Sequence, residues 1–64
     1  MTDNFNKYYE RLMGMKKAEI IREGITWDIW ANTEGNVKEL MSWKKILLAR
    51  HLADRLVRLE LRGY

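Results

Sequence analysis

The fold is decided by residues 36–64, which read NVKELMSWKKILLARHLADRLVRLELRGY. Neither Pro nor Gly interrupts residues 37–62, and the helix-favouring residues Leu, Lys, Arg and Ala are abundant there. Asn36 is a favourable N-cap, and Glu39 follows it at the spacing of a capping box. We therefore expect one long helix over about 37–62, either straight or bent near Ser42, where the apolar face shifts.

This expected helix carries more apolar surface than a single face can hold. At about 100° per residue, one apolar line follows its second half and a further apolar strip runs beside that line. The line is Leu48, Leu52, Leu56 and Leu59, and the strip is Ile46, Ala49, Ala53 and Val57. A helix that is apolar over much of its circumference is normally buried on more than one side. Because the rest of a 64-residue chain is too small to cover it, we expect a second copy or a partner.

A basic strip runs between these apolar lines. It consists of Lys44, His51, Arg55, Arg58 and Arg62. Counted from residue 36 onward, seven Lys or Arg against three acids give a net charge of +4, while five against six in residues 1–35 give −1. Such a strip can meet phosphates, anionic lipid or an acidic protein surface. It can equally be a solvated face whose Arg stems cover apolar surface.

Length and composition limit the class of protein. A chain of 64 residues forms one domain, here 1–64, and buries only about 60% of its unfolded surface. Its core alone supplies about 3–5 kcal/mol, so a second source of stability is expected. The absence of Cys excludes disulfides and thiolate metal sites, which leaves self-association into a homo-oligomer as the expected source.

The sequence also bears on where the protein is found. No apolar run approaches the roughly 20 residues that span a bilayer, and the first residues lack a signal-peptide apolar region. The lack of Cys fits a reducing compartment. We expect a cytoplasmic protein without a transmembrane segment.

The first half of the chain predicts a shorter helix over about 4–23. Its apolar residues recur at three- and four-residue intervals, which is a helical face. They are Phe5, Tyr8, Tyr9, Leu12 and Met13, followed by Met15, Ala18, Ile20 and Ile21. Gly14 either lies within this helix or kinks it, and Gly24 is expected to end it. This aromatic and aliphatic face is expected to pack against the long helix.

Residues 26–35 admit several interpretations. We prefer a Trp-bearing connection or a short helix begun by Thr26, with a turn over residues 32–36. The alternative is a hairpin that pairs residues 26–30 with residues 37–40, but two short strands alone are marginal. A helix-turn-helix with its second helix starting at Trp27 is a weaker alternative, because that helix would contain no Arg or Lys to contact DNA.

The tryptophans of this connection are candidates for contact with a partner. Trp is enriched at binding hot spots because it combines a large area with one hydrogen-bond donor. Trp27 and Trp30 stand beside polar residues, so at least one of them is expected at the surface. In a small protein Trp more often belongs to the core, and this interpretation stays open for both residues.

Catalysis has little support in the sequence. His51 is the sole His, Cys is absent, and no nucleophile lies near His51 in the chain. Glu19 and Glu23 stand four residues apart, but two carboxylates are fewer ligands than a metal site needs. No Gly-rich phosphate loop is present. We expect no enzyme activity, no cofactor and no metal.

Taken together, these patterns predict an all-α fold, either a small helical hairpin or a three-helix arrangement, whose long C-terminal helix can dimerise into a bundle. No motif is specific enough to indicate a family. The predicted function is non-enzymatic binding of another protein, as a regulator, inhibitor or adaptor. The alternative is a nucleic-acid-binding regulator, either a monomer or a dimer, that uses the basic face of the C-terminal helix. The predicted contact residues are Trp27, Trp30, Lys44, His51, Arg55, Arg58 and Arg62.

Overall fold

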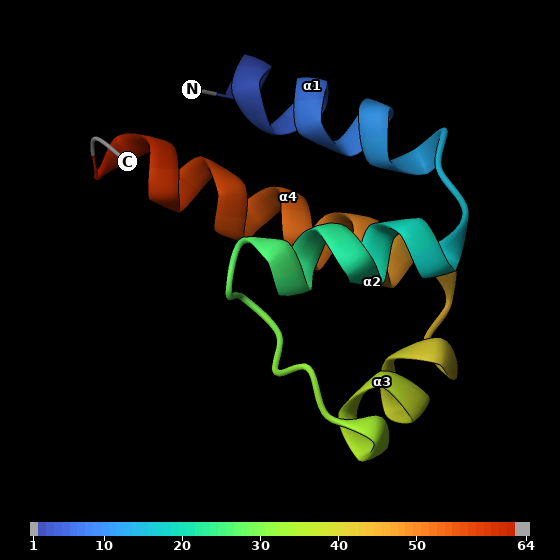
Figure 1. Cartoon of the computed structure of the whole chain (residues 1–64). Helices are drawn as coiled ribbons and strands as arrows, with labels where there is room; N and C mark the ends of the chain where they lie inside the picture. The colour runs from blue at the N-terminus through green and yellow to red at the C-terminus, as the bar shows by residue number, and fades with distance from the viewer. Residues whose placement is uncertain (1, 63–64) are drawn as a thin grey trace.

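The computed structural model describes residues 2–62 and contains four α-helices over that range (Figure 1). They are α1 (Thr2–Met13), α2 (Lys17–Thr26), α3 (Glu34–Met41) and α4 (Lys45–Leu61). Helices α1 and α4 run antiparallel and make the largest helix–helix contact, while α2 packs against both α4 and α3. The predicted all-α fold with a long C-terminal helix is confirmed.

The helix expected over about 37–62 is interrupted, and this part of the prediction is wrong. Helix α3 ends at Met41 and is followed by its C-cap Ser42, whose hydroxyl donates a hydrogen bond to the carbonyl oxygen of Glu39 at 2.5 Å. The Trp43 N–H bonds back to the carbonyl of Leu40, and Lys44 is extended, so a new helix starts at residue 45. A hydroxyl that competes for backbone carbonyls favours such an end.

The start of α3 also differs from the predicted capping box. Its N-cap is Thr33, whose hydroxyl oxygen accepts a hydrogen bond from the N–H of Asn36 at 3.2 Å. The side chain of Asn36 donates to the carbonyl of Ala31 at 2.9 Å instead of capping a helix. Residues 27–33 connect α2 to α3 and contain neither a helix nor a strand. The expected Trp-bearing connection is therefore present, whereas the short helix, the hairpin and the helix-turn-helix motif are not formed.

The helix expected over about 4–23 is likewise two helices. After α1, the Met15 N–H bonds to the carbonyl of Leu12, and the chain turns before Lys16. The Glu19 carboxylate accepts a hydrogen bond from the Lys16 N–H at 2.9 Å, so Glu19 caps the start of α2. Gly24 does not end this helix, which continues to Thr26.

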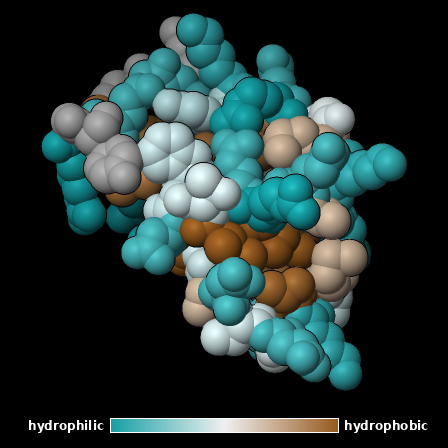
Figure 2. All heavy atoms as spheres, in the orientation of Figure 1, coloured by the Kyte–Doolittle hydropathy of each residue, from teal (hydrophilic) through white to brown (hydrophobic). Residues whose placement is uncertain are grey.

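The core lies where α1, α2 and α4 meet, with one buried residue added by α3 and one by the connection. Its members are Leu12, Ile20, Ile21, Trp30, Leu40, Leu48, Ala49, Leu52, Ala53 and Leu56. In the view of Figure 2 most of the surface is hydrophilic, and hydrophobic residues gather between α2 and α3. Burial of ten such residues gives this small chain one core.

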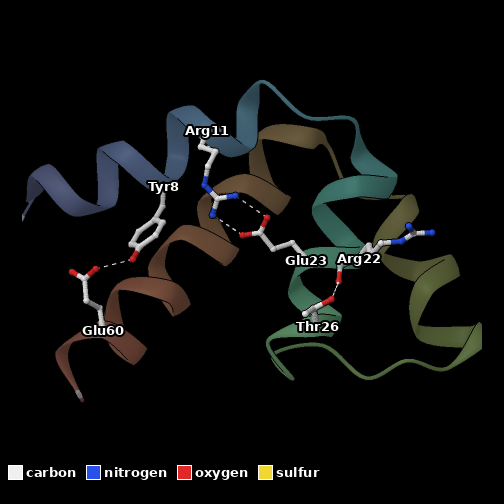
Figure 3. Close-up of polar contacts among 6 residues, drawn as sticks. All are labelled: Tyr8, Arg11, Arg22, Glu23, Thr26 and Glu60. Atoms are coloured by element: carbon white, nitrogen blue, oxygen red, sulfur yellow. Dashed lines mark hydrogen bonds and ion pairs between the residues drawn. The ribbon is translucent and has the colours of Figure 1, made fainter. Parts of the chain in front are cut away.

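Two carboxylates, of the exposed Glu60 and the half-buried Glu23, hold α1 to its neighbours (Figure 3). Glu60 of α4 accepts hydrogen bonds from the Tyr8 hydroxyl at 2.7 Å and from the Asn4 amide, and the bond to Glu60 raises the pKa of Tyr8. Glu23 of α2 accepts two hydrogen bonds from the Arg11 guanidinium, at 2.8 and 2.6 Å, which raise the pKa of Arg11. These bonds fix the position of α1 against both α4 and α2.

Candidate partner-binding groove

One of the two predicted contact tryptophans belongs to the core. Trp30 is only 8% exposed, and its backbone N–H donates a hydrogen bond to the carbonyl oxygen of Gly24 at 3.3 Å. The indole covers Gly24 so closely that a β-carbon at that position would lie 2.2 Å from the ring. Trp30 therefore folds back onto α2 and is not available to a partner, whereas Trp27 is 39% exposed.

His51 joins this buried indole to the surface of α4. Its ring stacks on Trp30 with centroids 5.7 Å apart, and the Trp43 ring meets it edge-on at 5.9 Å. The Nδ1 atom is buried and has no hydrogen-bond partner among the described residues. Burial, and secondarily the charge of Arg55, lowers the pKa of His51, although Asp54 acts in the opposite direction. His51 therefore packs between the two indoles, and its surroundings favour the neutral imidazole.

A groove lies on the outward side of α4, beside His51. Its volume is about 950 Å³, and it begins at the turn between α3 and α4. The lining residues are Phe5, Ser42, Trp43, Lys44, Ile46, Leu47, Arg50, His51 and Asp54. Ile46 and Leu47 are 43% and 48% exposed, and together with the half-buried Trp43 they give the groove an apolar surface that is open to solvent.

The polar residues of the groove are divided between its two ends. Lys44 lies at the start of α4 and Arg50 two turns further on, and both are exposed. Asp54 is the acidic residue of the lining, and its carboxylate already accepts a hydrogen bond from Arg58 at 3.1 Å. The field over the apolar lining is therefore positive.

A smaller recess of about 260 Å³ lies further along α4. Its lining residues are Trp27, Asp28, Ile29, Arg55, Arg58, Leu59 and Arg62. Asp28 has a positive φ of 60°, the left-handed region that Asp tolerates better than most residues, and it turns the connection beside α4. The recess brings three predicted arginines next to Trp27.

The predicted basic strip is thus divided between two sites. Lys44 and His51 line the groove, whereas Arg55, Arg58 and Arg62 line the recess. Sequence reasoning missed the aliphatic part of the groove, although the surplus apolar strip that includes Ile46 was its signal. It also missed Trp43, which the break at Ser42 places at the end of the groove rather than inside a continuous helix.

Neither the arrangement of possible metal-binding side chains nor the comparisons with known proteins indicate a class of chemistry. Among the side chains that the structure describes, no three from His, Asp or Glu gather as metal ligands would. Within residues 2–62 no helix is both long and apolar enough to cross a membrane. The chain matches no protein-family model, no curated protein and no solved structure.

Proposed function

We propose that this chain is a small, non-enzymatic interaction protein that binds another protein along the groove and acts as a regulator, inhibitor or adaptor. The observation that carries the proposal is the exposure of Ile46 and Leu47 beside Trp43 on the outward side of α4. Exposed apolar surface rimmed by polar residues is a feature of protein interaction sites.

The chemistry of the groove supports binding rather than catalysis. His51 is its one imidazole, and its Nδ1 atom is buried against the core. The hydroxyl of Ser42 donates to the carbonyl of Glu39, so it is engaged in ending α3. A nucleophile next to a base, the usual arrangement for covalent catalysis, is not formed by these two side chains.

Affinity capture with the immobilised protein tests this proposal. We expect the double variant Ile46→Ser/Leu47→Ser to lose the captured protein, because it removes the two exposed aliphatic side chains of the groove. The matched control is Leu61→Ser, which replaces an exposed leucine outside the groove. Circular dichroism should show the same helix content for all three proteins. Capture that survives the double variant would refute the groove as the binding site.

A second candidate function is nucleic-acid binding, and the arginine recess favours it. Arg55, Arg58 and Arg62 line one recess with Trp27, which provides cations for phosphates and a ring for base stacking. Replacing the three arginines with Gln should abolish retardation of DNA or RNA at low salt. Replacing the exposed Arg22 of α2 with Gln is the control. Capture that vanishes after nuclease treatment would favour this function over the first.

We further infer a cytoplasmic location from the composition and self-association from the small core. The lack of Cys supports a reducing compartment. The small core supports a gain of stability from a second copy. Sedimentation of the purified protein at several concentrations measures the second inference directly.

A further inference from the structure

We infer that the groove binds an acidic amphipathic helix of the partner protein, with the apolar face of that helix against α4 and its carboxylates toward Lys44 and Arg50. This inference rests on the proposed function, because it names the class of partner for the same site. Its support is the shape of the groove, the order of its apolar residues and the sign of its charge.

The groove has the dimensions of a short helix. Its lining residues on α4 extend from Ile46 to Asp54, eight residues further along, which corresponds to about 12 Å or just over two helical turns. Recognition of one helix by a groove uses apolar anchors at positions i, i+3 or i+4, and i+7 of the bound segment. Anchors at i and i+7 lie about 10 Å apart along a helix, so this length is enough to seat three of them.

The apolar residues form a continuous lining for these anchors. Ile46 and Leu47 provide the aliphatic surface on α4, and Trp43 closes the end near the α3–α4 turn. Phe5 of α1 lines the same groove, and its ring stacks on that of Tyr9 with centroids 6.0 Å apart, which restrains it. Side chains that are already held by aromatic packing lose little conformational entropy when a partner binds.

The charge around this lining selects an acidic partner. Lys44 and Arg50 are the two cations of the groove, and the opposing carboxylate of Asp54 is already bound to Arg58. The first turn of α4 contains no acidic residue, and its cap Lys44 makes no side-chain cap hydrogen bond, so the positive end of the helix dipole adds to the same field. Carboxylates on the flanks of a bound helix would meet complementary charge.

The same charges argue against a second copy of the chain, and against nucleic acid, as the occupant of the groove. In a two-fold dimer the same lining would face itself, and the two cations of each copy, Lys44 and Arg50, outnumber its one carboxylate, Asp54, which is paired with Arg58. Nucleic acid is bound by rows of cations along the phosphates, whereas here two cations flank an aliphatic surface. An acidic amphipathic helix satisfies both the apolar lining and its rim.

Two synthetic peptides of about 18 residues test the inference with the full chain. They share one Leu face at helical spacing and differ only on its flanks, which carry Glu in the acidic peptide and Lys in the basic peptide. Fluorescence anisotropy at low salt should show that the acidic peptide binds about tenfold more tightly, because two attractive contacts replace two repulsive ones. The ratio should fall toward one in about 0.5 M salt.

Charge reversal supplies the matched pair of variants. Lys44→Glu/Arg50→Glu should invert the preference in favour of the basic peptide. Arg55→Glu/Arg62→Glu changes the net charge equally but alters the recess, so the acidic peptide should remain preferred. An equal effect of both double variants would mean that overall charge, and not the groove, determines the preference, and would overturn the inference.

The remaining outcomes separate this inference from the proposed function. If Ile46→Ser/Leu47→Ser abolishes the binding of both peptides but the wild type does not discriminate between them, the groove still docks a protein and the acidic class is wrong. If neither peptide binds, the inference fails, and loss of affinity capture by the same variant would still uphold the proposed function. A wild-type dimer that becomes a monomer in this variant would assign the groove to a second copy and also overturn the inference.

Discussion

The two sides of α4 contrast sharply although they belong to one helix. On the inner side Leu48 and Leu52 have no exposed surface, and α1 and α2 cover them. On the outer side the adjacent Ile46 and Leu47 retain nearly half of their surface. A 64-residue chain is too small to cover both sides of α4, so Ile46 and Leu47 stay exposed.

The outer side itself changes character along the helix. Its first half presents Ile46 and Leu47, whereas its second half presents Arg55, Arg58 and Arg62. The Glu60 carboxylate lies near the end of this second half and is bonded to Tyr8 of α1. One helix thus carries an aliphatic site and a basic site, with the contacts of α1 alongside the latter.

The largest expected effect comes from truncating neighbouring leucines on opposite sides of α4. Leu48→Ala should lower the free energy of unfolding by about 2–5 kcal/mol, because it opens a cavity in a fully buried site. Leu47→Ala should change it by less than about 0.5 kcal/mol, because that side chain is exposed. Urea denaturation of both variants measures the difference. Equal losses would mean that the outer side is also sealed, as in a stable dimer.

A smaller effect is expected where the connection packs on α2. Gly24→Ala should cost about 1–3 kcal/mol, because the new methyl group would overlap the Trp30 ring and force it to move. Gly35→Ala is the matched control, since nothing lies within 4 Å of a β-carbon there. It should stabilise the protein by up to about 1 kcal/mol through helix propensity. Thermal unfolding of both variants tests the pair, and a harmless Gly24→Ala would mean that Trp30 is not held against α2.

The sequence predicted the helical class well because composition alone favours it. Leu, Lys, Arg and Ala dominate the residues of α4, and no Pro or Gly interrupts them. The sequence indicated a bend near Ser42 and a kink at Gly14 as alternatives, but not complete breaks, because the apolar pattern continues across both positions, from Met13 to Met15 and from Met41 to Trp43. Each break depends on local hydrogen bonds that periodicity does not report.

The site was harder to predict than the fold. The spacing of the basic residues placed them on one strip, but it could not show that Lys44 and His51 would face the groove and Arg55 the recess. Similarly, Trp27 and Trp30 look equivalent in the sequence. What distinguishes them is that Trp30 packs on Gly24, a contact between residues that the turn after α2 brings together.

The smallest expected effect is a pH dependence at His51, which lies between the sealed and open sides of α4. Burial, followed by the charge of Arg55, lowers the pKa of His51 in the folded protein. In the unfolded chain the imidazole regains its ordinary pKa of about 6.5. Below that pH the unfolded chain therefore binds the proton more readily, so stability that is present above about pH 6.5 is lost as the pH falls toward the folded pKa.

His51→Phe separates this contribution from that of the carboxylates. The Phe ring still packs between Trp30 and Trp43 but cannot bind a proton. Urea denaturation at about pH 7.5 and about pH 5.5, on either side of the ordinary His pKa, should show a larger loss of stability for the wild type than for the variant. The carboxylates titrate in both proteins, so their effect cancels in this difference. A wild type that loses no more than the variant would mean that the ring of His51 is as well solvated in the folded protein as in the unfolded chain, and that the open side of α4 extends further toward the core than its buried Nδ1 atom indicates.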